Sequence, residues 1–343
     1  MIRRGSNRYS VASVAMRVAI ALAIAGCSDT DRPMTTLAPK SDLAQWIQNL
    51  FIEVTLWDAL VFAIVVVAFI LALFVFSTRV GEAAPASTAS SDLGLEIAWT
   101  LGPVLILLMI SVPTIRTIFR SQPAVPPAGA LVIKVVAHQW WWEFDYPDGA
   151  KTGNELHIPV NRPIRLSLES ADIIHSFWVP QLGGKTDLIP NHPNTMWIDP
   201  EKPGLYLGQC AQFCGMEHAK MLLRVYVDTP DQFAAWVKAQ QQPGRQPDPQ
   251  NAAVAAGRHV FETEACVNCH TISGTPAKGT FGPDLTHLMS RATIAAGAAP
   301  NTPNNLHAWI QDPNTFKPGA LMPAMQLSDQ ETDEVVAYLA TLH

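Results

Sequence analysis

Two long apolar stretches occupy the first third of the chain. Residues 59–76 contain no charged or polar side chain. As a helix they reach about 27 Å, close to the ~30 Å hydrocarbon core of a bilayer. Residues 97–115 form a second apolar run, whose two prolines are tolerated in a membrane helix. We therefore expect a transmembrane hairpin over residues 45–120, with the preceding and following chain on one side of the membrane.

The hydrophobic pattern shortens after a Pro-rich connector at residues 123–129. Short strand-like runs spaced by Pro, Gly and Asn predict an all-β sandwich or barrel over residues 129–236. The Gln- and Pro-rich residues 237–251 predict a linker, and the Ala-rich start of residues 252–343 predicts a helical domain. The strand-like runs are residues 131–136, 163–169, 195–198 and 222–227.

The first residues predict an export signal over residues 1–27. Arg3, Arg4 and Arg8 precede a short apolar core. The sequence IAGC, which ends at Cys27, resembles a bacterial lipoprotein signal, in which the cysteine is lipidated and becomes the new N-terminus. An ordinary signal and an uncleaved helix are the alternatives. Export places the chain after the hairpin outside the cytoplasm.

Charge and cysteine content narrow the function classes. The net charge of -6 gives no nucleic-acid signal. All five cysteines have a local context, in the export signal or in one of two ligand motifs, so none is left for a disulfide framework.

One loop concentrates metal ligands. Cys210, Cys214, His218 and Met221 offer two thiolates, an imidazole and a thioether, a soft set that suits copper. Two thiolates are one more than a mononuclear blue-copper site uses, so we favour a pair of copper ions bridged by both sulfurs. A second imidazole is then required, and His175 is the best candidate.

Three other interpretations of the loop stay open at this point. The ligand spacing would also line one face of a core helix, although Gly208 and Gly215 weaken a helix there. Cys210 and Cys214 could form a disulfide in an exported chain. A tetrahedral zinc site is the third, but zinc has no special use for Met221.

The sequence CVNCH at residues 266–270 is the Cys-x-x-Cys-His motif of c-type haem attachment. Cys266 and Cys269 add to the haem vinyl groups, and His270 is the proximal iron ligand. The alternative interpretations of this motif are a thioredoxin-like cysteine pair, which requires a βαβ context, and half of a zinc site, which requires another Cys/His pair. The chain offers neither.

A methionine is expected as the second axial ligand of that haem, because a His/Met pair raises the reduction potential. Met322 is the favoured candidate, since it precedes a proline in an extended segment. Met325 and Met289 are the alternatives. A capping box that starts at Ser328 predicts a last helix after this segment.

Two further features have both a structural and a functional interpretation. Neighbours in a strand point to opposite sides, so at least one of Trp140, Trp141 and Trp142 is predicted at the surface. These rings could form a membrane-interface belt or a docking surface through which electrons enter. Glu96, at the mouth of the second apolar run, either faces water or guards a proton path.

Together, these motifs resemble subunit II of the haem-copper cytochrome c oxidases, in the bacterial form with a fused C-terminal cytochrome c domain. The resemblance covers nearly everything from about residue 50 to the end. It is carried by LEIAWT (95–100), HQWWW (138–142), DIIHSF (172–177), KTD (185–187), the loop at 208–221, CVNCH (266–270) and Met322.

The resemblance implies a multi-domain fold: a transmembrane helical hairpin, an all-β cupredoxin-like domain and an all-α class I cytochrome c domain. It implies two copper ions in a copper A centre and one covalently bound haem c. Trp140 resembles the tryptophan through which electrons enter, and Glu96 the carboxylate at the mouth of a proton pathway into subunit I. The implied copper ligands are Cys210 and Cys214 as bridges, His175 and His218 with one ion each, and Met221 and the Gln212 carbonyl as weak ligands.

Two positions depart from the family pattern. Gln212 stands where the family often has a glutamate that also binds magnesium. The carbonyl ligand survives this change, but the anionic side chain does not, so a typical magnesium site is not expected. Pro190 and Asn191 stand where the family usually has Pro-Gly, which alters a loop on the surface that faces the catalytic subunit.

The implied function is electron transfer within an aerobic respiratory cytochrome c oxidase. The implied partners are subunit I, subunit III, an external donor such as cytochrome c, and membrane lipid. The implied place is the bacterial inner membrane, with the copper and haem domains on the periplasmic side. Oxygen is reduced in subunit I, so this chain is an enzyme only as part of the complex. An electron-transfer subunit of a nitrogen-oxide reductase and a copper-binding assembly protein are the alternatives.

Overall fold

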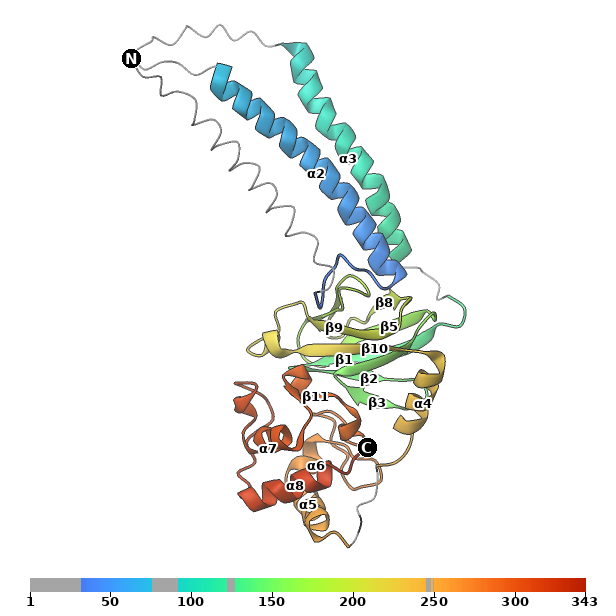
Figure 1. The fold of residues 1–343 in the computed structure, drawn as a ribbon, viewed down its shortest axis with the longest axis vertical. Coiled ribbons are helices and arrows are strands. Elements are labelled where there is room, and N and C mark those ends of the chain that lie inside the picture. Colours follow the sequence, from blue (N-terminus) through green and yellow to red (C-terminus); the bar gives the residue numbers. More distant parts are fainter. Residues whose placement is uncertain (1–31, 76–91, 122–126, 245–247, 249) are drawn as a thin grey trace, which may run out of the picture.

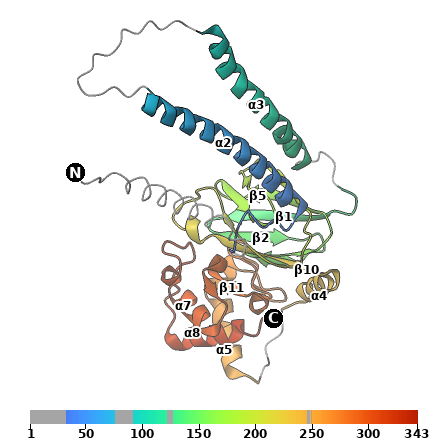
Figure 2. The same cartoon turned by 45° about the horizontal axis from the view of Figure 1, so that its top comes forward.

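The computed structural model describes residues 32–75, 92–121, 127–244, 248 and 250–343. A pair of long helices is followed by a β-sandwich and then by a helical domain (Figure 1). Figure 2, turned by 45°, also shows the helical domain on the side of the sandwich away from the helix pair. The predicted fold class is confirmed. The predicted export signal, with Cys27, lies outside the described residues.

The helix pair is formed by α2 (Asp42–Val75) and α3 (Leu93–Ser121). Both helices are longer than the apolar runs that predicted them. Their large apolar side chains are exposed along most of their length, as contact with lipid requires. Within the described ranges, these two helices are long and apolar enough to cross a membrane.

The start of α2 and the end of α3 both lie next to the sandwich (Figure 1). Leu43 is buried in the core of the sandwich, and the Ser41 hydroxyl donates a hydrogen bond to the Leu182 carbonyl at 2.6 Å. The Arg120 guanidinium lies 5.9 Å from the centre of the Trp46 ring and links the two helix ends. The hairpin therefore returns the chain to the side from which it started, as predicted.

Two five-stranded sheets form the sandwich, with strand orders β3-β2-β1-β5-β8 and β4-β10-β9-β6-β7. Neighbouring strands are antiparallel, except that β1 pairs with β5 and β4 with β10 in parallel. The strands are β1 (Leu131–His138), β2 (Trp141–Asp145), β3 (Lys151–Gly153), β4 (Glu155–Pro159), β5 (Ile164–Ser170), β6 (His175–Trp178), β7 (Thr186–Leu188), β8 (Asn194–Ile198), β9 (Gly204–Cys210) and β10 (Leu222–Asp228).

The four predicted strands correspond to β1, β5, β8 and β10. In β1 the buried side chains are Leu131, Ile133, Val135 and Ala137, the alternation expected of a strand with one face on the core. The other strands are short or interrupted by Gly, Pro and charged residues. Pairing within the sheets, rather than a local pattern, stabilises them.

The helical domain is built around α5 (Ala252–Thr263) and α8 (Asp329–Leu339), which pack together through the rings of Phe261 and Tyr338. The Ser328 capping box is present as predicted. The domain also contains α6 (Cys266–Cys269), α7 (Pro303–Gln311), β11 (Thr293–Ile294), β12 (Ala299–Pro300) and the 3-10 helices η2 (Leu288–Ser290), η3 (Ala295–Gly297) and η4 (Pro313–Thr315); α4 (Pro230–Gln240) and η1 (His218–Lys220) belong to the sandwich.

Replacing Gly257 with alanine is expected to destabilise the helical domain. A Cβ at this position would lie 1.8 Å from the Glu334 carbonyl oxygen of α8, so α5 and α8 must move apart. We expect a loss of about 3 kcal/mol in the free energy of unfolding, measured by chemical denaturation. Ala255→Gly, on the exposed side of α5, is the control and should cost about 1 kcal/mol. Equal stability of G257A and the parent would contradict the close helix contact.

Candidate copper and haem sites

All six predicted copper donors lie together where β9 ends and β10 begins, beside the start of β6. Such closely spaced sulfur, imidazole and carbonyl donors, with two thiols at the centre, fit a pair of soft metal ions. The distances are 3.8 Å between the Cys210 and Cys214 sulfurs, 3.9 Å from Cys210 Sγ to His175 Nδ1, 3.2 Å from Cys210 Sγ to the Gln212 carbonyl, 3.5 Å from Cys214 Sγ to His218 Nδ1, and 3.8 Å from Cys214 Sγ to Met221 Sδ.

The sandwich fixes this loop at both ends. The Cys210 N–H donates to the Met221 carbonyl at 3.0 Å, and the Ala211 N–H donates to the Ser176 carbonyl of β6 at 2.9 Å. The ligands come from a strand end, a loop and a short 3-10 helix, so the interpretation as one face of a core helix is wrong. The two cysteines are free, with sulfurs 3.8 Å apart, and form no disulfide.

Asp172 orients the imidazole of His175. Its carboxylate lies 2.8 Å from His175 Nε2, which leaves Nδ1 directed at Cys210. Burial disfavours the charged imidazole, but the bonds to Asp172 and Cys210 outweigh burial and raise the pKa of His175. A carboxylate on the far nitrogen is the arrangement that fixes the tautomer of a metal-binding histidine.

The two thiols affect each other's ionisation. The hydrogen bond from Cys214 and the contact with His175 lower the pKa of Cys210 to about 3. The bond with Cys210, together with burial, raises the pKa of Cys214. The pair thus gives up its first proton readily and holds the second one. Binding of positive metal ions is needed to release the second proton.

The prediction that at least one of the three tryptophans reaches the surface is wrong. Trp142 is fully buried in the sandwich, with an edge contact to Phe177, and Trp140 and Trp141 are each 9% exposed. Trp140 and Trp141 line a pocket of the helical domain, which covers them. The membrane-belt interpretation is wrong for the same reason. The prediction from strand alternation failed because the helical domain packs on the face of the sandwich that was expected to meet solvent.

Trp140 also contacts the loop at residues 208–221, the copper loop, directly. Its Nε1–H donates to the Cys214 carbonyl at 2.8 Å, and the Gln139 amide donates to the same oxygen at 2.8 Å. Trp141 stacks on His138, with ring centres 4.2 Å apart, and burial lowers the pKa of His138 to about 4. Trp140 therefore lies between the loop and the pocket of the second domain, with the stacked pair of Trp141 and His138 beside it in the chain.

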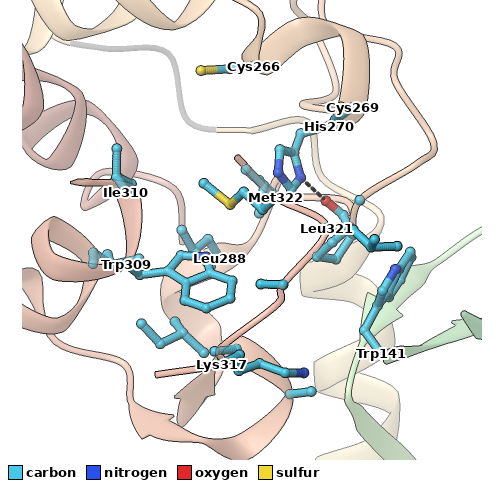
Figure 3. A pocket seen from close by; sticks show the side chains of 18 of the residues that line it. Trp141, Cys266, Cys269, His270, Leu288, Trp309, Ile310, Lys317, Leu321 and Met322 are labelled. Carbon is cyan, nitrogen blue, oxygen red and sulfur yellow. Dashed lines mark hydrogen bonds between the residues drawn. The ribbon is translucent and has the colours of Figure 1, made fainter. Parts of the chain in front are cut away.

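The helical domain contains a pocket lined by Cys266, Cys269, His270 and Met322, with Phe261, Leu288, Trp309 and Leu339 among its apolar walls. Figure 3 shows the side chains of His270 and Met322 in this pocket, with Trp141 at its edge. His270 Nδ1 lies 2.8 Å from the Pro283 carbonyl, which leaves Nε2 free. Burial lowers the pKa of His270, so the ring is neutral, as an iron ligand must be. The residues fit a covalently attached haem.

The alternative methionines are placed differently. Met325 also lines the pocket, whereas Met289 is not among the lining residues and packs against the core of the helical domain. Met322 lies partly buried in that core, on the segment between η4 and α8. The geometry therefore retains Met322 and Met325 as candidates.

Glu96 lies in the first turn of α3, at the end of the hairpin away from the sandwich (Figure 1). It is partly exposed. This position is on the opposite side of the proposed membrane from the copper loop. Gln212 is partly buried, and its carbonyl oxygen lies 3.2 Å from Cys210 Sγ, beside the other candidate donors.

Two charged residues that the sequence did not single out connect the domains. Glu155 of β4 and Lys317 of the helical domain are 3% and 4% exposed, and each bonds to the backbone of the other domain. Burial lowers the pKa of Lys317 to about 8. No local pattern marks either residue, because their burial arises from packing between segments far apart in the chain. In the sequence, a role for Lys317 near the haem pocket is indicated only by its position shortly before Met322.

Comparison with known proteins gives three family matches along the chain. The transmembrane domain of cytochrome c oxidase subunit II matches residues 38–117, its periplasmic domain matches residues 150–227, and cytochrome c matches residues 254–343. The match at residues 38–117 and the exposed apolar helices agree on membrane anchoring by the helix pair.

Several curated relatives match over most of the chain. Cytochrome c oxidase subunit 2 of Alkalihalophilus pseudofirmus is 35% identical over 94% of both chains. The protein of the same name from Bacillus sp. is 34% identical over 72% of this chain and 74% of its own. A solved structure, the periplasmic domain of subunit II of cytochrome oxidase from Bradyrhizobium japonicum, is 34% identical over 34% of this chain and 97% of its own, with a TM-score of 0.33.

Proposed function

Because the chain belongs to the cytochrome c oxidase subunit II family and carries a C-terminal cytochrome c domain, we propose that it is the electron-transfer subunit of an aerobic respiratory oxidase. The chain passes electrons from its haem c to a dinuclear copper A centre, and on to the haem of subunit I, where oxygen is reduced to water. The observation that carries this proposal is the position of Trp140, which lines the pocket with one ligand set and bonds to the loop that holds the other.

When bound, the copper pair and the haem iron each gain and lose one electron. The chain holds their ligands still while this happens. Strand β6 positions His175, the end of β9 positions Cys210, and the carboxylate of Asp172 fixes the orientation of His175. A rigid scaffold keeps the ligand geometry similar in both oxidation states, which favours fast transfer. Met221 and the Gln212 carbonyl are the weak ligands in this proposal.

Cys266 and Cys269 attach the haem in this proposal, and His270 and Met322 hold its iron. The Pro283 carbonyl fixes the tautomer of His270 by accepting the hydrogen bond from Nδ1. The apolar walls of the pocket exclude water from the ring. A thioether opposite the imidazole would raise the reduction potential of the iron, which favours acceptance of electrons from an external donor.

Trp140 connects the two sites. Its ring lines the haem pocket, and its Nε1–H bonds to the carbonyl of Cys214. In this proposal Trp140 is the residue through which a haem held in that pocket would pass electrons to the copper domain. An external donor such as cytochrome c meets the helical domain instead, since that domain covers the tryptophans.

The remaining partners follow from the two ends of the molecule. The hairpin anchors the chain in the bacterial inner membrane beside subunit I, with subunit III in the same complex. The copper and haem domains lie on the periplasmic side. Glu96, at the far end of α3, is at the mouth of the proton pathway into subunit I. Lipidation of Cys27 would add a second membrane anchor. The side chain of Gln212 supplies no anionic ligand for magnesium.

The test is a metal count and an electron paramagnetic resonance spectrum of the full chain, purified in detergent without other subunits. We expect two coppers and one haem per chain, with one unpaired electron shared over both coppers. One localised copper, or none, overturns the copper proposal.

Oxygen uptake by the purified complex separates an oxygen reductase from a nitrogen-oxide reductase. Ready loss of copper to an acceptor, without electron transfer from haem, would indicate a copper-delivery protein.

A further inference from the structure

The copper domain and the cytochrome c domain each insert one buried charged side chain into the other. Glu155 reaches from β4 into the cytochrome c domain, and Lys317 reaches back into the copper domain. Buried charges are costly unless they are fully hydrogen-bonded. These two are satisfied by backbone groups, which cannot rotate away as exposed side chains can, so they specify one orientation of the domains.

The Glu155 carboxylate accepts hydrogen bonds from both backbone and side chain of residues 292–293. The Ala292 N–H lies 3.0 Å from Oε1 and 3.1 Å from Oε2, and the Thr293 N–H and hydroxyl each lie 3.0 Å from Oε1. The buried guanidinium of Arg291, which donates to the Asp284 carbonyl, lies next to this contact and balances its charge. Because all of these donors come from one short segment, the carboxylate binds that segment in a single, specific geometry.

Lys317 makes the reciprocal contact close to the copper loop. Its ammonium group donates to the Trp140 carbonyl at 2.8 Å. The Trp140 ring in turn donates to the Cys214 carbonyl. The neighbouring Phe316 carbonyl accepts from Lys220, two residues after His218, at 2.6 Å. The segment that carries Met322 is thereby bonded to the loop that carries the copper ligands.

Two glycines allow the surfaces to approach closely. A Cβ on Gly153 of β3 would lie 2.9 Å from the Cβ of Pro283, and one on Gly319 would lie 2.3 Å from the Met216 sulfur. Pro283 is the residue whose carbonyl orients His270. The close fit therefore extends from the surface of the sandwich to the backbone that holds the proximal histidine.

We propose that Glu155 and Lys317 are positioning residues that keep the cytochrome c domain docked on the copper domain with its haem pocket against Trp140 and Trp141. Electron transfer then takes place within a fixed complex, and the domain does not swing to its target on a flexible tether. This inference rests on the proposed function, because it concerns the step from haem to copper. It adds two residues whose role is to fix the geometry of that step.

The test compares the purified oxidase containing the parent chain with Glu155→Ala and Lys317→Met. A photoexcited ruthenium reductant delivers one electron to the haem. The oxidation of the haem and the reduction of the copper pair by that electron are followed optically. We expect the transfer rate to fall about tenfold or more in each variant, because losing one partner of a buried charged bond weakens an interface by at least that factor. The rate should also become dependent on solvent viscosity in the variants, but not in the parent.

A second readout does not depend on electron transfer. Hydrogen exchange of residues 139–141, which line the pocket of the cytochrome c domain, should accelerate in both variants. Glu155→Gln keeps an acceptor oxygen and should give intermediate values. The matched controls are Glu169→Ala, which removes an exposed ion pair with Lys134, and Lys278→Met, which removes an exposed lysine. Both should behave as the parent, since exposed pairs contribute little.

The outcomes separate this inference from the proposed function. Haem and copper contents equal to those of the parent establish that both domains have folded. If Glu155→Ala loses copper, Thr293→Val replaces it as the test variant, because it removes one hydrogen-bond donor to Glu155 and leaves every residue of the copper domain unchanged. An unchanged rate together with unchanged exchange over residues 139–141 overturns the positioning role alone. The absence of haem-to-copper transfer in the parent overturns the proposed function itself.

Discussion

Replacing Cys214 with serine is expected to remove the dinuclear copper centre and to lower oxygen uptake by the assembled oxidase about 100-fold or more. The Cys214 sulfur lies 3.5 to 3.8 Å from the donor atoms of Cys210, His218 and Met221, so it is central to the proposed ligand set. A serine hydroxyl does not ionise at neutral pH and is a harder donor than a thiolate. Copper content, the paramagnetic resonance spectrum and oxygen uptake measure the effect.

The control for this variant is Met221→Leu, which removes only a weak ligand of similar size. We expect it to retain both coppers with an altered spectrum. Haem content should be that of the parent in both variants, because the cytochrome c domain has its own core. A C214S chain with two coppers and the parental spectrum would rule out Cys214 as a bridging ligand.

Replacing Met322 with leucine is expected to lower the reduction potential of the haem by on the order of 100 mV or more, since a thioether ligand raises the potential of a haem. For one electron, about 59 mV corresponds to a tenfold change in equilibrium constant. A shift of this size therefore disfavours reduction of the haem by the external donor by more than tenfold, whereas it favours the onward step from haem to copper. Redox titration of the haem absorbance measures it, and oxygen uptake with an external donor should fall in parallel.

Met325→Leu and Met289→Leu are the matched controls. Met325 lines the same pocket as Met322, whereas Met289 is not among the lining residues. We expect both controls to retain the parental potential within the error of the titration. A large fall in M325L, with M322L unchanged, would assign the iron ligand to Met325 instead.

The donor sets of both candidate sites could be predicted from the sequence because most of the donors are local. Cys210, Cys214, His218 and Met221 lie within one loop, and Cys266 and His270 within another. Short spacings constrain which atoms can meet, whatever the rest of the fold does. The membrane hairpin could be predicted for a similar reason, since a helix that spans a bilayer is recognised by the length of its apolar stretch.

His175 was a prediction of a different kind. It comes from β6, and the sheet brings it to Cys210 through the pairing of β6 with β9. The requirement for a second imidazole selected it, but no spacing did. Its partner Asp172 was not predicted, because the loop before β6 has to fold before the carboxylate can reach Nε2.

The sequence alone thus determined the order of the modules and supplied the donor motifs behind the proposed metal chemistry, since these depend on composition and short-range spacing. Only the tertiary structure decided that Trp140 and Trp141 are covered, and that Glu155 and Lys317 are buried between domains. Alternation within a strand tells which faces are opposite, but not what packs on each face. Burial at an interface is a sum of many contacts between distant segments, and no single stretch of sequence encodes it.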